Sequence, residues 1–241
     1  MKNIVFIPNI KLDDNRSTPY YYSIKSWQHF CEKYDCELVV WEDLIFPVED
    51  MKITWQRYYL FDILEANNIE YDQVLMVDAD TIVHPNCPNF FEETDGKYCG
   101  VMNDGCYEWV TRSIRDFNRE LFPNTTPPTP CTYINGGFQI VNKKHKGFFS
   151  SMQKYYSEHK DSIQFAIDKI KAGTDQTIVN YMLKINKVDV KILPPSYNLQ
   201  DLFRKNLLHI PGHSWWPDTL EGLYNAGWVY HFNAIPQNDR H

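Results

Sequence analysis

The chain has 241 residues, of which 43% are hydrophobic and 23% charged, with a formal net charge of −7 at pH 7. A chain of that length can bury one core, so we expect a single domain over residues 1–241. The acidic balance, without a cluster of Lys and Arg, does not favour nucleic acid as a partner. No apolar stretch approaches the ~20 residues that cross a bilayer, and the apolar run at residues 4–7 is too short for a signal peptide. We therefore expect a cytoplasmic protein without a transmembrane segment.

The six cysteines lack the close pairing that zinc sites use, and they are few for a disulfide scaffold of this length. We expect free thiols at Cys31, Cys36, Cys87, Cys99, Cys106 and Cys131.

Strand and helix patterns alternate through the first hundred residues, which is typical of a parallel α/β sheet. We expect strands at residues 4–7, 38–41 and 74–77. A first helix is expected with Thr18 as its cap and Pro19 in its first position, and a second over residues 55–66. The pattern predicts an α/β fold with helices on the faces of the sheet.

The second half of the chain begins with an irregular stretch over residues 104–130, interpreted as a loop or lid with a short helix at residues 109–117. A glycine turn at residues 135–137 is then expected to lead into a strand at residues 138–141. Helices are predicted at residues 148–156 and 175–183, the latter capped by Thr174, and a last strand at residues 190–193.

Asp78-Ala79-Asp80 directly follows the apolar third strand. In open α/β sheets ligands bind at the carboxyl edge, and two carboxylates there can hold a hard divalent cation, with Mg²⁺ or Mn²⁺ as the natural occupant. The same pair could also simply turn the chain. A phosphatase of the haloacid dehalogenase type uses Asp-x-Asp as nucleophile and acid, but normally after the first strand and followed by Gly-Thr, whereas here Thr81 follows immediately.

An ordered series of motifs resembles the glycogenin-like and bacterial galactosyltransferase-like retaining glycosyltransferases, often called family 8. It runs from about residue 4 to residue 236. Its members are Arg57 in its helix, the strand ending in Asp78-Ala79-Asp80, a next strand ending in Asp104, Asn135-Gly136-Gly137, Asp175-Gln176, a Leu-Pro strand end with Asn198, and His231-Phe232-Asn233-Ala234. The resemblance implies a single-domain GT-A fold, with a nucleotide-binding half at about residues 1–104 and an acceptor-side half at about residues 105–241.

The resemblance also implies the role of each motif. Asp78, Asp80 and His231 would hold the metal. The resemblance implies a nucleotide sugar as donor, with a UDP-sugar favoured, and a hydroxyl of a glycan or another molecule as acceptor. The implied donor-binding residues are Pro8, Asn9, Arg57, Asp78, Ala79, Asp80, Asn135 and Gly136, and the implied catalytic residues that line the donor sugar are Asp104, Asp175 and Gln176.

Ordinary structural roles remain open for these residues. Arg57 could be a solvated cation, Asp175 a first-turn acid, and His231 a packed strand histidine, with His209 and His213 as rival metal ligands. A non-catalytic nucleotide-sugar-binding module also remains an alternative.

The sequence departs from the family in its last part. The family's closing motif continues to a Lys that contacts the diphosphate, whereas Gln237 stands here, so Arg57, Lys52 or Arg204 would have to supply the positive charge. The segment 203–227 aligns with nothing in the family, and within it we expect acceptor contacts from His209, His213, Trp215 and Trp216. The family retains anomeric configuration, and because the Gln176 amide is a poor nucleophile, a front-face transfer is expected.

Overall fold

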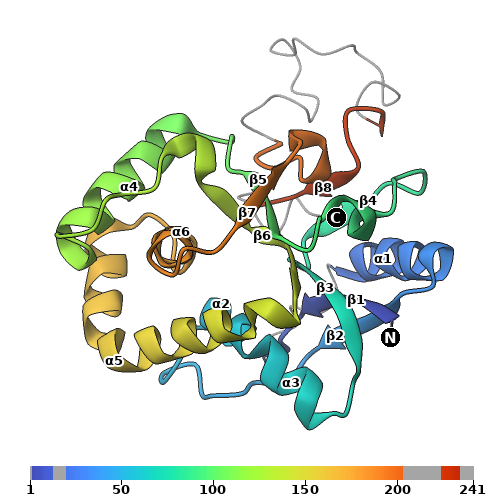
Figure 1. Ribbon diagram of the computed structural model, residues 1–241, viewed down its shortest axis with the longest axis horizontal. Coiled ribbons are helices and arrows are strands. Elements are labelled where there is room, and N and C mark those ends of the chain that lie inside the picture. Colours follow the sequence, from blue (N-terminus) through green and yellow to red (C-terminus); the bar gives the residue numbers. More distant parts are fainter. Residues whose placement is uncertain (1, 13–19, 203–223, 234–241) are drawn as a thin grey trace.

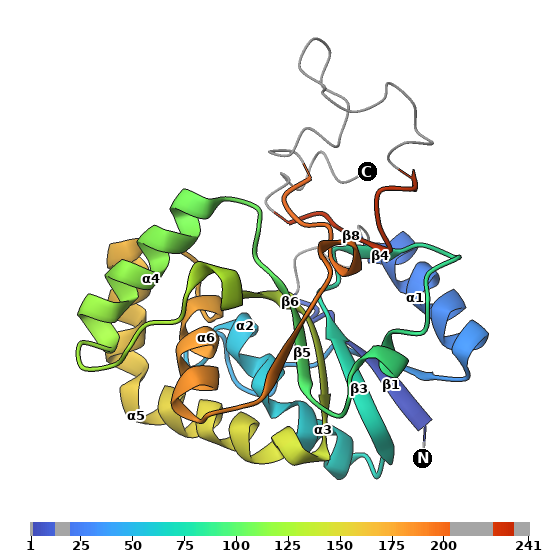
Figure 2. The ribbon, with the colours of Figure 1, turned by 45° about the horizontal axis from the view of Figure 1, so that its top comes forward.

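The computed structural model describes residues 2–12, 20–202 and 224–233 of the chain. Its centre is a six-stranded sheet with the strand order β2-β1-β3-β6-β5-β7, which runs through the middle of the molecule in Figures 1 and 2. The strands are β1 (Lys2–Pro8), β2 (Glu37–Trp41), β3 (Tyr71–Val77), β5 (Tyr98–Met102), β6 (Ile134–Asn142) and β7 (Val190–Leu193).

β6 lies antiparallel to both of its neighbours, β3 and β5, while the other neighbouring strands are parallel. The carboxyl ends of β1, β3, β5 and β7 therefore meet the amino end of β6 at one edge of the sheet. Asp78 follows β3 at this edge, and Asn135 lies at the start of β6. Polar residues from distant parts of the sequence are thus brought together.

Alternate residues of the central strands pack into two separate cores. Ile4 and Phe6 of β1 face one core, while Val5 and Ile7 face the other, and all four are fully buried. This alternation follows from the period of two of a strand whose two faces are both covered.

Helices cover the two faces unequally. Among the described residues, the α-helices on one face are α2 (Ile53–Gln56), α3 (Leu60–Ala66), α4 (Tyr107–Leu121), α5 (Lys146–Ile170) and α6 (Gln176–Ile185) (Figure 1). The other face is covered by α1 (Tyr21–Tyr34), whose Trp27 and Phe30 are buried against it.

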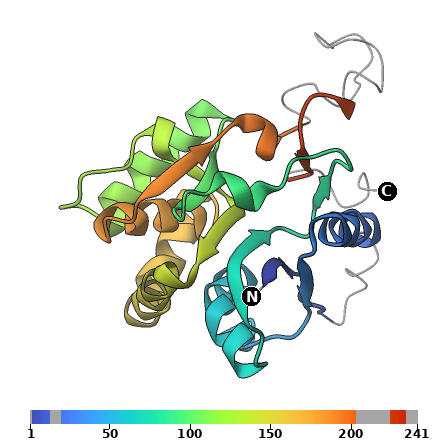
Figure 3. The same ribbon diagram turned by 45° about the vertical axis from the view of Figure 1, so that its right-hand side comes forward.

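A second, two-stranded sheet lies beside α1 (Figure 3). It pairs β4 (Thr81–Val83) with β8 (Val229–His231) in antiparallel register, with Thr81 opposite His231. This pairing joins the segment directly after Asp80 to the far end of the chain. None of the helices within the described ranges combines the length and apolar character that crossing a bilayer requires.

Several sequence predictions are confirmed. The strands expected at residues 38–41, 74–77 and 190–193 lie within β2, β3 and β7. The predicted α/β fold class is confirmed as well, whereas the division into a nucleotide-binding and an acceptor-side half stays a prediction. The predicted cap Thr18 and Pro19 lie outside the described residues.

The glycine turn expected at residues 135–137 is wrong. These residues belong to β6, and neither Gly136 nor Gly137 has a positive φ. Glycine is needed there for close approach of neighbouring atoms, as described below. Thr174 is also not the cap of the following helix, because the N-cap position is Asp175.

Two helices also differ from expectation. The short helix expected at residues 109–117 is confirmed but lies within the longer, 15-residue helix α4, so the irregular stretch is limited to residues 104–106 and the proline-rich segment after Leu121. The helix expected at residues 55–66 is interrupted by a 3₁₀ turn at Arg57–Tyr59, between α2 and α3. Periodicity alone does not reveal this turn, because three residues are too few to change the apolar pattern of the segments around them.

Candidate metal and donor site

Asp78, Asp80 and His231 form a compact group of possible metal ligands. One ligand atom of each lies within 4.8 Å of the others. His231 Nε2 is 3.2 Å from Asp80 Oδ1 and 3.6 Å from Asp78 Oδ2. The predicted trio is therefore brought together from positions 150 residues apart in the sequence.

Backbone hydrogen bonds fix the three residues. Asp78 N–H donates to Gly137 O at 3.1 Å, which ties the end of β3 to β6. Phe232 N–H donates to Asp80 O at 2.8 Å, and His231 N–H donates to Leu199 O at 2.8 Å. The turn after β3 and the strand β8 are thus held against each other on both sides of the ligand group.

Gly137 makes room for the group. A Cβ added at Gly137 would lie 2.6 Å from Asp78 Oδ2 and would also collide with His231 Cε1. Any larger residue would push these two ligands away. The glycine here serves close packing against the site, which explains why it occurs inside a strand.

The donor atoms fit a divalent cation. Neighbouring corners of an octahedron with bonds of about 2.1 Å are about 3 Å apart, close to the separation of Asp80 Oδ1 and His231 Nε2. Two carboxylates and an imidazole suit Mn²⁺ or another first-row metal, and carboxylates with water suit Mg²⁺. His231 is buried, and its Nδ1 has no hydrogen-bond partner within the described residues. The side chains of Asp78 and Asp80 are partly exposed, which leaves access for a ligand.

Arg57 connects the ligand group to a second carboxylate. Its Nη1 donates to Asp78 Oδ1 at 2.9 Å and to Gly136 O at 2.8 Å. Its Nε lies 3.9 Å from Asp175 Oδ2. Only 10% of the Arg57 side chain is exposed, so the alternative of a solvated surface cation is wrong. The 3₁₀ turn at Arg57–Tyr59 is the local structure that carries this side chain.

The electrostatic balance at the site depends on these contacts. Burial opposes the positive charge of Arg57, but Asp78 and Asp175 outweigh it and raise the pKa of the guanidinium. Burial likewise opposes protonation of His231, while Asp80 and then Asp78 favour it and raise the pKa of the imidazole. A metal ion bound to these carboxylates would compete with that proton.

Asp175 and Gln176 lie at the start of α6, beside Arg57. Asp175 accepts hydrogen bonds from Tyr58 Oη at 3.0 Å and Thr174 Oγ1 at 2.9 Å. Gln176 Oε1 accepts from Gly136 N–H at 3.0 Å. Asp175 is buried, so it is more than an exposed first-turn acid. Both side chains are held in fixed positions against the start of β6.

Asn135 is the centre of a buried amide network. Its Oδ1 accepts from Gly137 N–H at 2.8 Å and from Asn198 Nδ2 at 3.1 Å. Its Nδ2 donates to Gln200 Oε1 at 2.7 Å, and Gln200 in turn donates to Met102 O at 2.7 Å. Most of the bonding capacity of the Asn135 amide is therefore used inside the protein.

The other predicted donor residues lie at the same edge of the sheet. Pro8 ends β1, and the buried Asn9 follows it, with its N–H donating to Trp41 O at 2.8 Å. Asp104 lies two residues after the end of β5. Ala79 stands between the two metal-ligand carboxylates and packs against the core on the α1 side of the sheet.

Several predicted residues cannot be placed. The expected acceptor residues His209, His213, Trp215 and Trp216 lie outside the described residues, as do Arg204 and Gln237. Of the three cations considered as a substitute for the family's lysine, Arg57 contacts the ligand group. Lys52 is exposed directly before α2.

Sequence reasoning missed four residues that support the site: Tyr58, Gly137, Gln139 and Gln200. Gln139 Nε2 donates to Gly136 O at 2.7 Å, and its Oε1 accepts from Tyr98 Oη. A signal was present in the sequence, because Gln139 is the one polar residue of the strand expected at residues 138–141. Such a residue needs a buried partner, which here is the backbone of the site.

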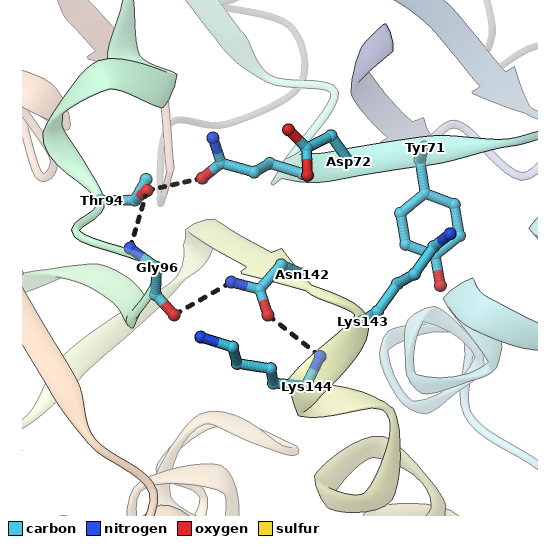
Figure 4. Close-up of a pocket in the computed structure, with 8 residues that line it drawn as sticks. Tyr71, Asp72, Thr94, Gly96, Asn142, Lys143 and Lys144 are labelled. Atoms are coloured by element: carbon cyan, nitrogen blue, oxygen red, sulfur yellow. Dashed lines mark hydrogen bonds between the residues drawn. The ribbon is translucent and has the colours of Figure 1, made fainter. Parts of the chain in front are cut away.

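A separate cavity of about 320 Å³ lies at the opposite end of β3 (Figure 4). Tyr71, Asp72 and Gln73 from the start of β3 line it, together with Thr94, Gly96 and Asn142–Lys144. Because β3 runs from this cavity to Asp78, the cavity is not part of the candidate site.

Comparison with known proteins relates the fold to glycosyltransferases. Neither a family model nor a curated protein sequence matches the chain. Among solved structures, one similar chain is a glycosyltransferase involved in the glycosylation of the major capsid of PBCV-1, with a TM-score of 0.60 and 11% identity over 100% of this chain and 97% of that chain. Mouse xyloside xylosyltransferase 1 in its apo form gives a TM-score of 0.49 and 15% identity over 98% of this chain and 99% of that chain.

The first of these comparisons shows that the described α/β fold is shared with a glycosyltransferase structure, as the expected fold class requires. The specific likeness to family 8 remains a resemblance of sequence motifs.

Proposed function

We propose that the chain is a metal-dependent glycosyltransferase that moves a sugar, of the hexosyl type, from a nucleoside diphosphate sugar to an acceptor hydroxyl. The observation that carries this proposal is the group formed by Asp78, Asp80 and His231 at the carboxyl edge of the sheet, with Arg57 bound to Asp78. A metal ion held next to Arg57 would place two positive charges beside the departing diphosphate.

The proposed leaving-group site consists of the metal ligands and Arg57. A bound Mn²⁺ or Mg²⁺ would supply positive charge that offsets the negative charge developing on the nucleoside diphosphate as it leaves the sugar. Asp78, Asp80 and His231 would hold it. Arg57 keeps Asp78 oriented and adds a second positive charge at the same place, which supports its proposed role as the substitute for the family's lysine.

The proposed donor-sugar site lies on the Arg57 side of the ligand group. Asp175 and Gln176 are held there by Tyr58, Thr174 and the backbone of β6, so their polar groups can be presented to sugar hydroxyls without reorganisation. We place Asp104 and Asn135 in the same subsite, and Pro8 and Asn9 at the nucleoside. Uridine is the proposed nucleoside.

We propose that the transfer retains anomeric configuration. An inverting enzyme needs a carboxylate base behind the sugar, and a covalent route needs a strong nucleophile, which the amide of Gln176 is not. In a front-face transfer a departing phosphate oxygen accepts the proton of the acceptor hydroxyl. The acceptor is proposed to be a glycan or another hydroxyl compound bound near the segment with His209, His213, Trp215 and Trp216.

A thermal-shift experiment tests the proposal. The full chain is heated with UDP, GDP and other nucleoside diphosphates, each with and without Mn²⁺, and the matched variant Asp80→Asn is measured in parallel. We expect one diphosphate to raise the melting temperature only when Mn²⁺ is present, and Asp80→Asn to lose this effect while it still folds. Incubation with the matching sugar nucleotides should then release the diphosphate.

Other outcomes would support the alternatives. Cleavage of a phosphomonoester without a sugar nucleotide would indicate a phosphatase, in which Asp78 would be the nucleophile. In the structure, however, Arg57 contacts one carboxylate oxygen of Asp78 and His231 the other. A third outcome is that the chain binds a nucleoside diphosphate only with Mn²⁺ but releases no diphosphate from any sugar nucleotide, even with an acceptor present. That outcome would indicate a binding module. Analysis of the first-formed anomer by NMR tests retention.

A further inference from the structure

A chain of two hydrogen bonds runs from helix α1 to the turn that carries the metal-ligand carboxylates. The indole Nε1 of Trp27 donates to Thr81 Oγ1 at 2.9 Å. Thr81 Oγ1 in turn donates to the backbone oxygen of Asp78 at 2.7 Å. Trp27 and Thr81 are both fully buried. These two residues lie outside the ligand group, yet they contact its backbone.

The direction of both bonds is fixed by chemistry. An indole N–H can only donate, so Thr81 must accept from Trp27, and its single proton is left for the Asp78 carbonyl. The Thr81 hydroxyl can therefore satisfy both partners in one way only. The carbonyl of Asp78, and with it the start of the Asp78–Asp80 turn, is therefore held in one orientation.

Thr81 also contacts the other half of the ligand group through the backbone. It is the residue of β4 that stands opposite His231 in β8. Helix α1 supports this strand at a second point, because Val83 N–H donates to Ser26 Oγ at 3.1 Å. One side of α1 thus holds both the carboxylate turn and the strand that pairs with His231.

We propose that Trp27 and Thr81 are positioning residues of the metal centre, which they hold in its binding geometry before the metal arrives. This inference rests on the metal site of the proposed function. A preformed site binds a metal more tightly than one that must be ordered on binding, because the ordering of ligands opposes binding. A metal-affinity defect is therefore the signature of this role.

The competing explanation is that Thr81 only satisfies a buried indole in the core. Thr94 offers a matched comparison, because its buried hydroxyl also donates one hydrogen bond, to Gln73 Oε1 at 2.6 Å, and accepts another, from Gly96 N–H at 3.4 Å. Thr94 lies at the opposite end of β3, at the cavity of Figure 4. Loss of its hydroxyl should affect stability but not the metal.

The test measures Mn²⁺ affinity by the EPR signal of free Mn²⁺, with the full chain well below its melting temperature. Thr81→Val removes the hydroxyl at nearly constant volume, and we expect its Mn²⁺ dissociation constant to rise about tenfold, as for the loss of one well-placed hydrogen bond. Thr81→Ser restores the hydroxyl and should bind nearly as the wild type does. Thr94→Val should have wild-type affinity, even where its melting temperature falls as much as that of Thr81→Val.

Wild-type affinity in a folded Thr81→Val variant would overturn the inference while leaving the proposed metal site intact. Equal weakening in Thr94→Val would also overturn it, because the effect would then be general loss of stability. If the wild type binds no Mn²⁺, the proposed site fails, and this inference fails with it. Should Thr81→Val not fold, Trp27→Phe replaces it: about threefold weaker binding supports the proposal, and unchanged binding contradicts it.

Discussion

Arg57 and Asp78 form an ion pair with a separation of 2.9 Å, and the Arg57 side chain is only 10% exposed. The same guanidinium lies 3.9 Å from Asp175, so one buried cation serves two carboxylates, one directly after β3 and one at the start of α6. The candidate site is therefore held together by an electrostatic contact between the segments that carry the metal ligands and the proposed donor-sugar residues.

Replacing Arg57 by Met should destabilise the protein strongly. Without the guanidinium, Asp78 and Asp175 lose their counter-charge, and breaking a buried pair in this way costs about 3 kcal/mol of unfolding free energy. Chemical denaturation measures the loss. Lys2→Met is the matched control, since it breaks an exposed pair with Asp35 and should leave the unfolding free energy almost unchanged. Equal stability of Arg57→Met and the wild type would contradict the account of Arg57.

Gly137→Ala should damage the metal site. The new methyl group would meet Asp78 Oδ2 and His231, and the strain of such overpacking is about 1–3 kcal/mol. We expect a lower melting temperature and at least about tenfold weaker Mn²⁺ binding if about 1.4 kcal/mol of that strain falls on the ligands. Gly147→Ala is the control, because nothing lies within 4 Å of a Cβ at that helical position. It should leave Mn²⁺ binding unchanged and stabilise the helix slightly.

Asn135→Ala should destabilise the start of β6. It leaves Gln200 Oε1, Asn198 Nδ2 and Gly137 N–H without their present partner. Each buried polar group left unpaired costs about 1–3 kcal/mol, so the melting temperature should fall clearly. If Asn135 served only to bind the sugar donor, Asn135→Ala would leave the melting temperature of the ligand-free protein unchanged. An unchanged melting temperature would therefore show that the network does not support the fold.

Acid should destabilise the protein in part through His145. Burial, helped by the charge of Lys144, lowers the pKa of this imidazole from 6.5 to about 4. Its Nδ1 accepts a hydrogen bond from Asn142 N–H at 3.0 Å, which requires that nitrogen to be unprotonated. Because the folded pKa lies below the unfolded one, the contribution of neutral His145 is complete above pH 6.5 and is lost as the pH falls towards 4.

The variant His145→Gln keeps a side-chain acceptor of the kind that capping boxes use but does not titrate. Its unfolding free energy should therefore fall less than that of the wild type between pH 6.5 and 4. Parallel pH profiles of the two proteins would refute the assignment.

The parts of the site that could be predicted are those that local sequence patterns indicate. The apolar strand that ends in Asp78-Ala79-Asp80 is readable because hydrophobic residues stop abruptly at two carboxylates. The pairing of Thr81 with His231 is different, because it joins two three-residue strands 150 positions apart, and strands that short have no periodicity of their own. Only the resemblance of motif order pointed to His231.

The glycines of β6 show why other features were misread. Asn135-Gly136-Gly137 has the composition of a turn, and a sequence does not reveal which atoms will lie against a glycine. In the fold, Gly137 faces Asp78 and His231, so the constraint is one of space rather than of backbone angle. The 3₁₀ turn at Arg57–Tyr59 could not be predicted for a similar reason. The turn directs Arg57 to Asp78 and Gly136, which are distant in the sequence.

The central claim is that Asp78, Asp80 and His231 hold one metal ion for a nucleoside diphosphate. Anomalous X-ray scattering at the manganese edge, from crystals of the full chain grown with Mn²⁺ and UDP, tests it most directly. We predict one strong peak in contact with Asp78, Asp80 and His231 Nε2, with the diphosphate oxygens on its open side. A diphosphate bound without a peak at these residues, or a peak held by other residues, would contradict the claim.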